Sequence, residues 1–204
     1  MSYPKARATA FVAVVIAMAL MAVSSAQATV LCKTTSTPCA ADYSKGTEIQ
    51  AVLAPGSSLS TSNTANEFVN TCERSAFEGA TANTGASTET VVIEVMGLIW
   101  WNCLNSPNTL IETGLLEFHH LSGTDNATVT AKGFTMTTFA GSFSCLYGFG
   151  EGTHIGTLTG GEEPILDLNA VVPKRAGSIL CPNDFIWAAE YTITTPQPLY
   201  VEPS

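Results

Sequence analysis

The stretch from Gly114 to Asn126 holds the densest group of side chains that could do chemistry. Glu117, His119, His120 and Asp125 lie close together in its sequence. Imidazole and carboxylate groups are common ligands of zinc, and they also act as general acids and bases. The first question is therefore whether the chain can bring these four side chains together in space.

The element expected to carry them is a β-strand, Leu110–His120, followed by the turn-forming segment SGTDN. Successive side chains of a strand point to opposite faces, so His119 and His120 cannot bind one metal ion from a regular strand. Glu117 and His119 share a face and would form half of a metal site that needs another ligand. The alternative is a polar pair packed across two strands, with Asp125 in the turn itself.

Two further stretches resemble ligand-binding loops in part. Gly148, Gly150 and Gly152 are spaced like a phosphate-binding loop. The dinucleotide fingerprint G-x-G-x-x-G, however, needs a glycine where Thr153 stands and a helix that begins there, and no helix is expected here. We therefore predict a glycine-rich hairpin at this position.

Carboxylates elsewhere in the chain give a weak indication of calcium, which binds several oxygen ligands. Glu162 and Glu163, with Asp125 or Asp167, could supply these oxygens, although their spacing matches no known calcium loop. We expect no other cofactor.

The residues of nucleophilic catalysis are not arranged in a recognisable pattern. The sequence has no G-x-S-x-G motif, and nothing in it selects a pair of carboxylates for glycoside hydrolysis. We therefore predict no catalytic residue and no enzymatic activity.

Trp100 and Trp101 form the most informative aromatic pair. On the expected strand Leu98–Cys103, one indole would face the core and the other would face outwards. An exposed tryptophan could stack on a sugar ring or contact a partner protein. The alternative is that a loop covers the outward ring, so the ligand-binding role of either tryptophan is a hypothesis.

The N-terminus has the order of a secretory signal peptide. Lys5 and Arg7 precede the apolar run Phe11–Val23, and Ala26-Gln27-Ala28 is a small-residue cleavage pattern. We predict cleavage after Ala28, an extracellular or cell-surface location, and no membrane insertion of the remaining chain.

The cysteine content agrees with export. All six cysteines follow the predicted signal peptide, and an even number in an exported chain indicates disulfides. Other pairings are compatible with the sequence, but the ones we expect are Cys32–Cys39, Cys72–Cys103 and Cys145–Cys181.

Charge limits the range of partners. The formal net charge is −9, and two of the eight basic residues lie in the predicted signal peptide. A nucleic-acid groove needs a basic track that neutralises phosphates, and no basic cluster exceeds the pair Lys174-Arg175. We therefore expect no nucleic-acid partner, and the lack of a basic track likewise disfavours binding to an anionic membrane surface.

The remaining chain is predicted to form one all-β domain, residues 29–204. Several segments alternate between apolar and polar residues, as Ala127–Lys132 does, which indicates antiparallel sheets with one buried face. We favour a disulfide-stapled β-sandwich of jelly-roll or Greek-key type, with a β-barrel as the alternative. The expected strands are Glu48–Leu53, Glu67–Cys72, Ser75–Ala82, Thr88–Val95, Leu98–Cys103, Leu110–His120, Ala127–Thr138, Gly141–Phe149, His154–Leu158, Ile165–Val172, Ser178–Cys181 and Ile186–Thr194.

Several longer segments resemble exported proteins of high-GC Gram-positive bacteria. The resemblance rests on EFHHLSGTDNATVTAKG, CLYGFGEGTHIGTLTGG, LDLNAVVP and LCPNDFIWAAEYTITTPQPLYV. It implies export, an all-β fold and paired cysteines. It implies no activity and assigns no functional residues.

These observations favour a secreted, non-catalytic protein that acts as an extracellular structural or interaction module. A carbohydrate-binding module that uses an exposed tryptophan is the second hypothesis. A hydrolase built on two carboxylates is the third.

Overall fold

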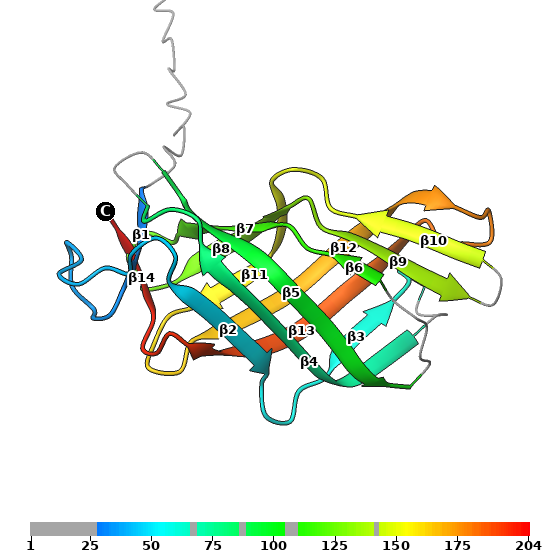
Figure 1. The fold of residues 1–204 in the computed structure, drawn as a ribbon, viewed down its shortest axis with the longest axis horizontal. Coiled ribbons are helices and arrows are strands. Elements are labelled where there is room, and N and C mark those ends of the chain that lie inside the picture. Colours follow the sequence, from blue (N-terminus) through cyan, green and yellow to red (C-terminus); the bar gives the residue numbers. More distant parts are fainter. Residues whose placement is uncertain (1–27, 66–68, 86–88, 105–109, 141–142) are drawn as a thin grey trace, which may run out of the picture.

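The computed structural model describes residues 28–65, 69–85, 89–104, 110–140 and 143–204, and within these ranges the chain is all-β (Figure 1). The predicted signal peptide therefore lies outside the described residues except for Ala28. The described strands are β1 (Thr29–Cys32), β2 (Glu48–Leu53), β3 (Leu59–Ser62), β4 (Val69–Thr81), β5 (Val91–Cys103), β6 (Leu110–Glu112), β7 (Leu115–His120), β8 (Ala127–Lys132), β9 (Thr135–Ala140), β10 (Phe143–Gly148), β11 (Thr153–Thr159), β12 (Ile165–Gly177), β13 (Asp184–Thr195) and β14 (Tyr200–Pro203).

The main strand pairings follow a closed path. β2 and β3 lie end to end between β13 and β4, and the path continues through β5, β7, β8, β11 and β12 back to β13. Each of these pairings is antiparallel. The predicted antiparallel all-β class is confirmed, and the finer choice between a sandwich and a barrel stays a prediction.

A second ladder branches from the far half of β12. The last residues of β12 pair with β10, β10 pairs with β9, and β9 pairs with β6. The sequence predicted one strand where β6 and β7 follow each other, and one strand where β8 and β9 follow each other. The breaks lie at Gly114 and Gly133. Gly114 packs so closely that an added Cβ would lie 2.1 Å from the carbonyl oxygen of Lys132, and Gly133 adopts a φ of 80°.

Two other predictions are wrong. The glycine-rich segment does not form a hairpin, because β10 and β11 both pair antiparallel with β12 and so run in the same direction along it. Ser178–Cys181 forms a turn rather than a strand, in which the Cys181 N–H donates to the Ser178 carbonyl oxygen at 3.0 Å.

A bulge in β5 decides where the two adjacent tryptophans point. Gly97 pairs with Glu78 and Val95 pairs with Gly79, so Met96 is an extra residue on β5. Before the bulge, odd-numbered residues such as Val95 are buried. After it, the even-numbered Leu98 is buried. One strand thus replaces the two that were predicted on either side of Gly97.

The two ends of the molecule differ. β1 pairs with β14, so both described termini lie at one end, called here the proximal end (Figure 1). The start of β10, the β12–β13 turn and the end of β5 lie at the opposite, distal end (Figure 1). Among the described residues, no helix is long and apolar enough to cross a membrane.

Three disulfides hold the described chain. They join Cys32 to Cys39, Cys72 to Cys103, and Cys145 to Cys181, which confirms the predicted pairing. Near the distal end, Cys72 faces Cys103 across β4 and β5, and Cys145 on β10 is joined to Cys181 in the β12–β13 turn.

Candidate functional site

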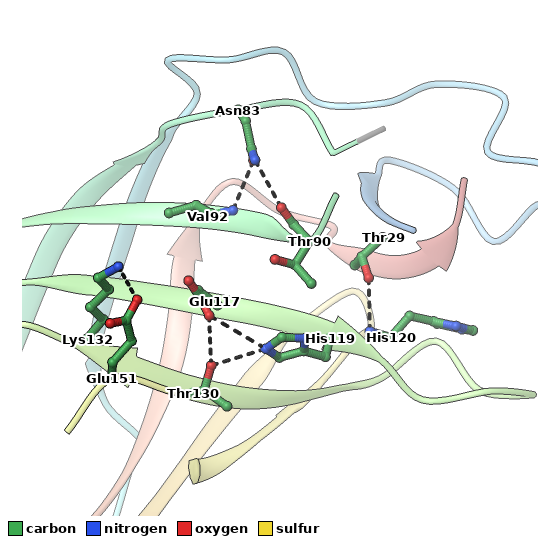
Figure 2. A network of polar contacts seen from close by, with 10 residues as sticks. All are labelled: Thr29, Asn83, Thr90, Val92, Glu117, His119, His120, Thr130, Lys132 and Glu151. Carbon is green, nitrogen blue, oxygen red and sulfur yellow. Dashed lines mark hydrogen bonds and ion pairs between the residues drawn. The ribbon is translucent and has the colours of Figure 1, made fainter. Parts of the chain in front are cut away.

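The predicted Glu117–His119 pair lies on the same face of β7, as strand alternation requires (Figure 2). Glu117 Oε2 lies 3.9 Å from His119 Nε2. The hydroxyl of Thr130, on the neighbouring β8, donates to Glu117 Oε2 at 3.2 Å and lies 3.1 Å from His119 Nε2. Glu117 and Thr130 face each other directly in the ladder, so the three side chains form a polar contact across two strands.

The other two residues of this stretch point elsewhere. The backbone N–H of His120 donates to the Thr29 hydroxyl at 3.1 Å (Figure 2). The ring Nε2 of His120 lies 2.8 Å from the Thr124 carbonyl oxygen. Asp125 follows β7 in the turn, where its carbonyl oxygen accepts from the N–H of Val201 at 3.0 Å. The separation of the two histidines and the position of Asp125 in the turn are therefore confirmed.

Metal ligands do not gather around this pair in the described part of the chain. Over those residues, no group of three or more His, Cys, Asp and Glu side chains is placed to hold a metal ion. Of the carboxylates considered for calcium, Glu162 accepts a hydrogen bond from the Tyr200 hydroxyl at 3.0 Å. This hydrogen bond raises the pKa of Tyr200 above its ordinary value.

The two adjacent tryptophans lie on opposite faces of β5, as predicted. Trp100 is half-buried, and its ring lies 5.8 Å from that of Trp187, which is itself in the core. Trp101 faces outwards and is 38% exposed. Of the two rings, that of Trp101 is the one presented to solvent. The hypothesis that a tryptophan of this pair binds a ligand therefore concerns Trp101 rather than Trp100.

The interior beneath Trp100 is packed with aromatic residues. Tyr191 is buried, its hydroxyl lies 2.7 Å from that of Ser75, and its ring meets Phe77 edge-on at 5.6 Å. Burial raises the pKa of Tyr191 well above its ordinary value, and the hydrogen bond to Ser75 only partly opposes this effect.

Small cavities remain beside this aromatic group. Two of them lie against Trp187, each with a volume of about 10 Å³, and both have almost entirely apolar linings. Such a volume holds roughly one water molecule, so these cavities are packing defects rather than a substrate pocket.

The outer face of β5 carries a strip of exposed apolar side chains that sequence reasoning missed. Ile99 is 62% exposed, and Met96 and Trp101 are exposed beside it. Before the bulge, the outward-facing residue is instead the acidic Glu94. Only Gly97 signalled this change in the sequence, because a glycine inside a strand pattern often marks a bulge.

No protein-family model matches this chain, and no curated protein or solved structure matches it either. The resemblance to exported bacterial proteins therefore stays a prediction.

Proposed function

We propose that this chain is a secreted, non-catalytic protein that works as an extracellular interaction module. The observation that carries the proposal is the apolar strip on the outer face of β5, formed by Met96, Ile99 and Trp101. Isolated exposed apolar residues are common, but neighbouring large ones on one strand are typical of a binding surface.

The surroundings of this strip fit a protein contact. Trp101 pairs across the ladder with Arg74, and Ile99 pairs with Ala76, so charged and small residues border the apolar side chains. Aromatic and arginine side chains are enriched where interfaces carry most of their binding energy. Three disulfides are consistent with an oxidising compartment, which supports export.

The polar residues that most resembled a reactive cluster support the non-catalytic part of the proposal. Glu117 and His119 contact Thr130 on the neighbouring strand, and His120 contacts a turn carbonyl. These contacts use the side chains to join neighbouring segments of the fold.

Turnover assays test the absence of catalysis. The chain from Thr29 to Ser204 would be incubated with panels of glycosidic, ester and peptide substrates. We expect no turnover above that of buffer. Turnover that disappears when Glu117 or His119 is replaced by alanine would refute the proposal.

Binding to a carbohydrate is the second candidate, and the surroundings of Trp101 favour it. Arg74 lies opposite Trp101 in the ladder, and the next residue on β5, Asn102, donates through Nδ2 to Glu73 Oε2 at 3.4 Å. An exposed indole can cover the apolar face of a sugar while polar neighbours bond to its hydroxyls.

A glycan array with and without a chelator separates this candidate from protein binding. Trp101→Ala should abolish any glycan signal, whereas Trp100→Ala changes a ring that faces the core and serves as the control for damage to the fold. No signal for the native chain, or a signal unchanged by Trp101→Ala, removes the carbohydrate candidate.

A further inference from the structure

The distal end displays large apolar side chains on its turns. On the β12–β13 turn, Ile179 is 96% exposed and Leu180 is 65% exposed. Phe143, at the start of the adjacent β10, is 43% exposed. These three residues are called here the distal tip. The β12–β13 turn and the start of β10, which carry them, lie at the end opposite the termini (Figure 1).

The backbone beneath the distal tip is firmly held. The disulfide from Cys145 to Cys181 ties the β12–β13 turn to β10, and Lys174 Nζ donates to the Cys181 carbonyl oxygen at 3.0 Å. Gly177 packs so closely that an added Cβ would lie 2.5 Å from the Ser144 carbonyl oxygen. A held turn loses little conformational entropy on binding, so its apolar side chains are already placed for contact.

Within the turn, backbone N–H groups are hydrogen-bonded to Ser178, while the apolar side chains are exposed to solvent. Ser178 Oγ accepts from the Leu180 N–H at 3.1 Å, and the Ser178 carbonyl oxygen accepts from the Cys181 N–H at 3.0 Å. The turn therefore satisfies polar groups locally while Ile179 and Leu180 extend away from the core. Burying a backbone polar group that lacks a hydrogen-bond partner is costly. Because these groups of the turn are already hydrogen-bonded, moving them from water into an apolar surface costs less.

The charged residues next to the distal tip indicate which kind of partner the tip would contact. The segments 143–147 and 176–183 contain no charged residue, and Lys174-Arg175, the only adjacent pair of basic residues after the predicted signal peptide, directly precedes the second segment. Arg175 is exposed, and the nearest acidic residues along the chain are Asp167 and Asp184. An apolar tip with cations at its base is complementary to a lipid bilayer, whose anionic headgroups lie above its hydrocarbon.

We propose that the distal tip docks the protein on an anionic phospholipid bilayer, with Ile179, Leu180 and Phe143 entering the interface and Arg175 near the headgroups. This differs from the sequence-based expectation, in which the lack of a basic cluster larger than Lys174-Arg175 disfavoured an anionic membrane surface. Some of the acidic residues lie away from this tip: Glu202 is on β14, and Glu162 and Glu163 follow Gly161, which pairs with Leu199 beside β14. Because the tip is separate from the β5 strip, this proposal does not rest on the proposed interaction through β5.

Vesicle flotation tests the proposal. Residues 29–204, which hold every described strand, would be mixed with vesicles of phosphatidylcholine, with or without phosphatidylglycerol. We expect binding to the anionic vesicles that weakens as salt concentration rises. Replacing both Ile179 and Leu180 by serine should lower the partition coefficient about tenfold, or ~1.4 kcal/mol.

Matched variants make the result decisive. Val52→Ser removes an apolar side chain from β2 that is as exposed as Phe143, at 43%, and should leave partitioning unchanged. Trp101→Ala should also leave it unchanged, so a failure of the β5 proposal is distinguishable from a failure of this one. Far-ultraviolet circular dichroism checks that each variant is folded.

Three outcomes would overturn the proposal. They are no binding of the native chain to anionic vesicles, equal binding by the serine variant, and a native dimer that the serine variant dissociates without losing vesicle binding. The last outcome would show that the distal tip is an interface between copies of the chain.

Discussion

The proximal and distal halves of this molecule use apolar residues in opposite ways. Where β7, β8 and β11 complete the closed path, Phe118, Val129 and Leu158 are fully buried. At the distal end, residues as large as Ile179 and Phe143 are exposed, one disulfide joins β4 to β5, and another joins β10 to the β12–β13 turn. The comparison suggests that covalent links replace part of the packing at the distal end and leave apolar side chains available for contact.

The polar groups follow the same division. The contact among Glu117, His119 and Thr130 covers the outside of β7 and β8 in the proximal half. On the distal half of β5, the corresponding outward surface is apolar at Ile99 and Trp101. The bulge at Met96 separates these two kinds of outer surface within one strand.

The largest expected effect tests the packing side of this comparison. Phe118→Ala removes a fully buried ring and should lower the free energy of unfolding by about 3–5 kcal/mol. Phe143→Ala, on the distal tip, should change it by less than about 0.5 kcal/mol. Urea unfolding followed by fluorescence measures both values, and equal losses would contradict the division of roles.

Removal of a distal disulfide tests the covalent side. Replacing Cys145 and Cys181 together by serine opens a loop with a sequence separation of 36 and should cost about 4 kcal/mol on the chain-entropy model. The same change at Cys32 and Cys39, whose separation is 7, should cost about 2.5 kcal/mol. Chemical unfolding of the two variants gives the comparison, and a smaller loss for the distal pair would contradict it.

The free energy of unfolding should depend on pH through the buried Tyr191. Burial raises the pKa of Tyr191 above the ordinary value of 10.0. Above that value the unfolded chain loses the tyrosine proton while the folded chain keeps it, so stability present at lower pH is lost as pH rises. The contribution of this group should fall by about 1.4 kcal/mol between neutral pH and pH 11.

Tyr191→Phe provides the control for this pH effect. The variant lacks the titrating hydroxyl, so its free energy of unfolding should depend less on pH above about 10 than that of the native chain. An unchanged slope would show that Tyr191 titrates normally in the folded protein.

A small effect is expected at the polar contact on β7. His119→Ala removes a half-exposed partner of Glu117 and Thr130 and should change the free energy of unfolding by less than about 1 kcal/mol. Thermal unfolding with and without added zinc checks the metal hypothesis in the same samples. A zinc-dependent rise in the midpoint that vanishes in His119→Ala would mean that this face binds metal after all.

Local rules predicted much of the fold. Alternation separated His119 from His120 and placed Trp100 and Trp101 on opposite faces, because side-chain direction in a regular strand depends only on parity. Cysteine number and spacing led to the three disulfides. These predictions depend on neighbours in sequence, which the sequence shows directly.

Interactions between distant segments defeated the other predictions. The strand is interrupted at Gly114, where the backbone of Lys132 leaves no room for a Cβ. The glycine-rich segment does not reverse the chain, because the strands on both sides of it, β10 and β11, pair with β12. The short β1 and β14 were missed because they form a strand pair only with each other. The distal tip was also missed, since the turn at Ser178 was predicted to be a strand.

The most direct measurement of the central claim is hydrogen–deuterium exchange by mass spectrometry, with and without anionic vesicles. The account predicts that vesicles slow exchange in peptides covering 143–147 and 176–183, and that peptides covering the proximal β2 and β14 exchange at the same rate. Protection spread evenly over both ends, or confined to the proximal end, would contradict the claim that the distal end is the docking surface.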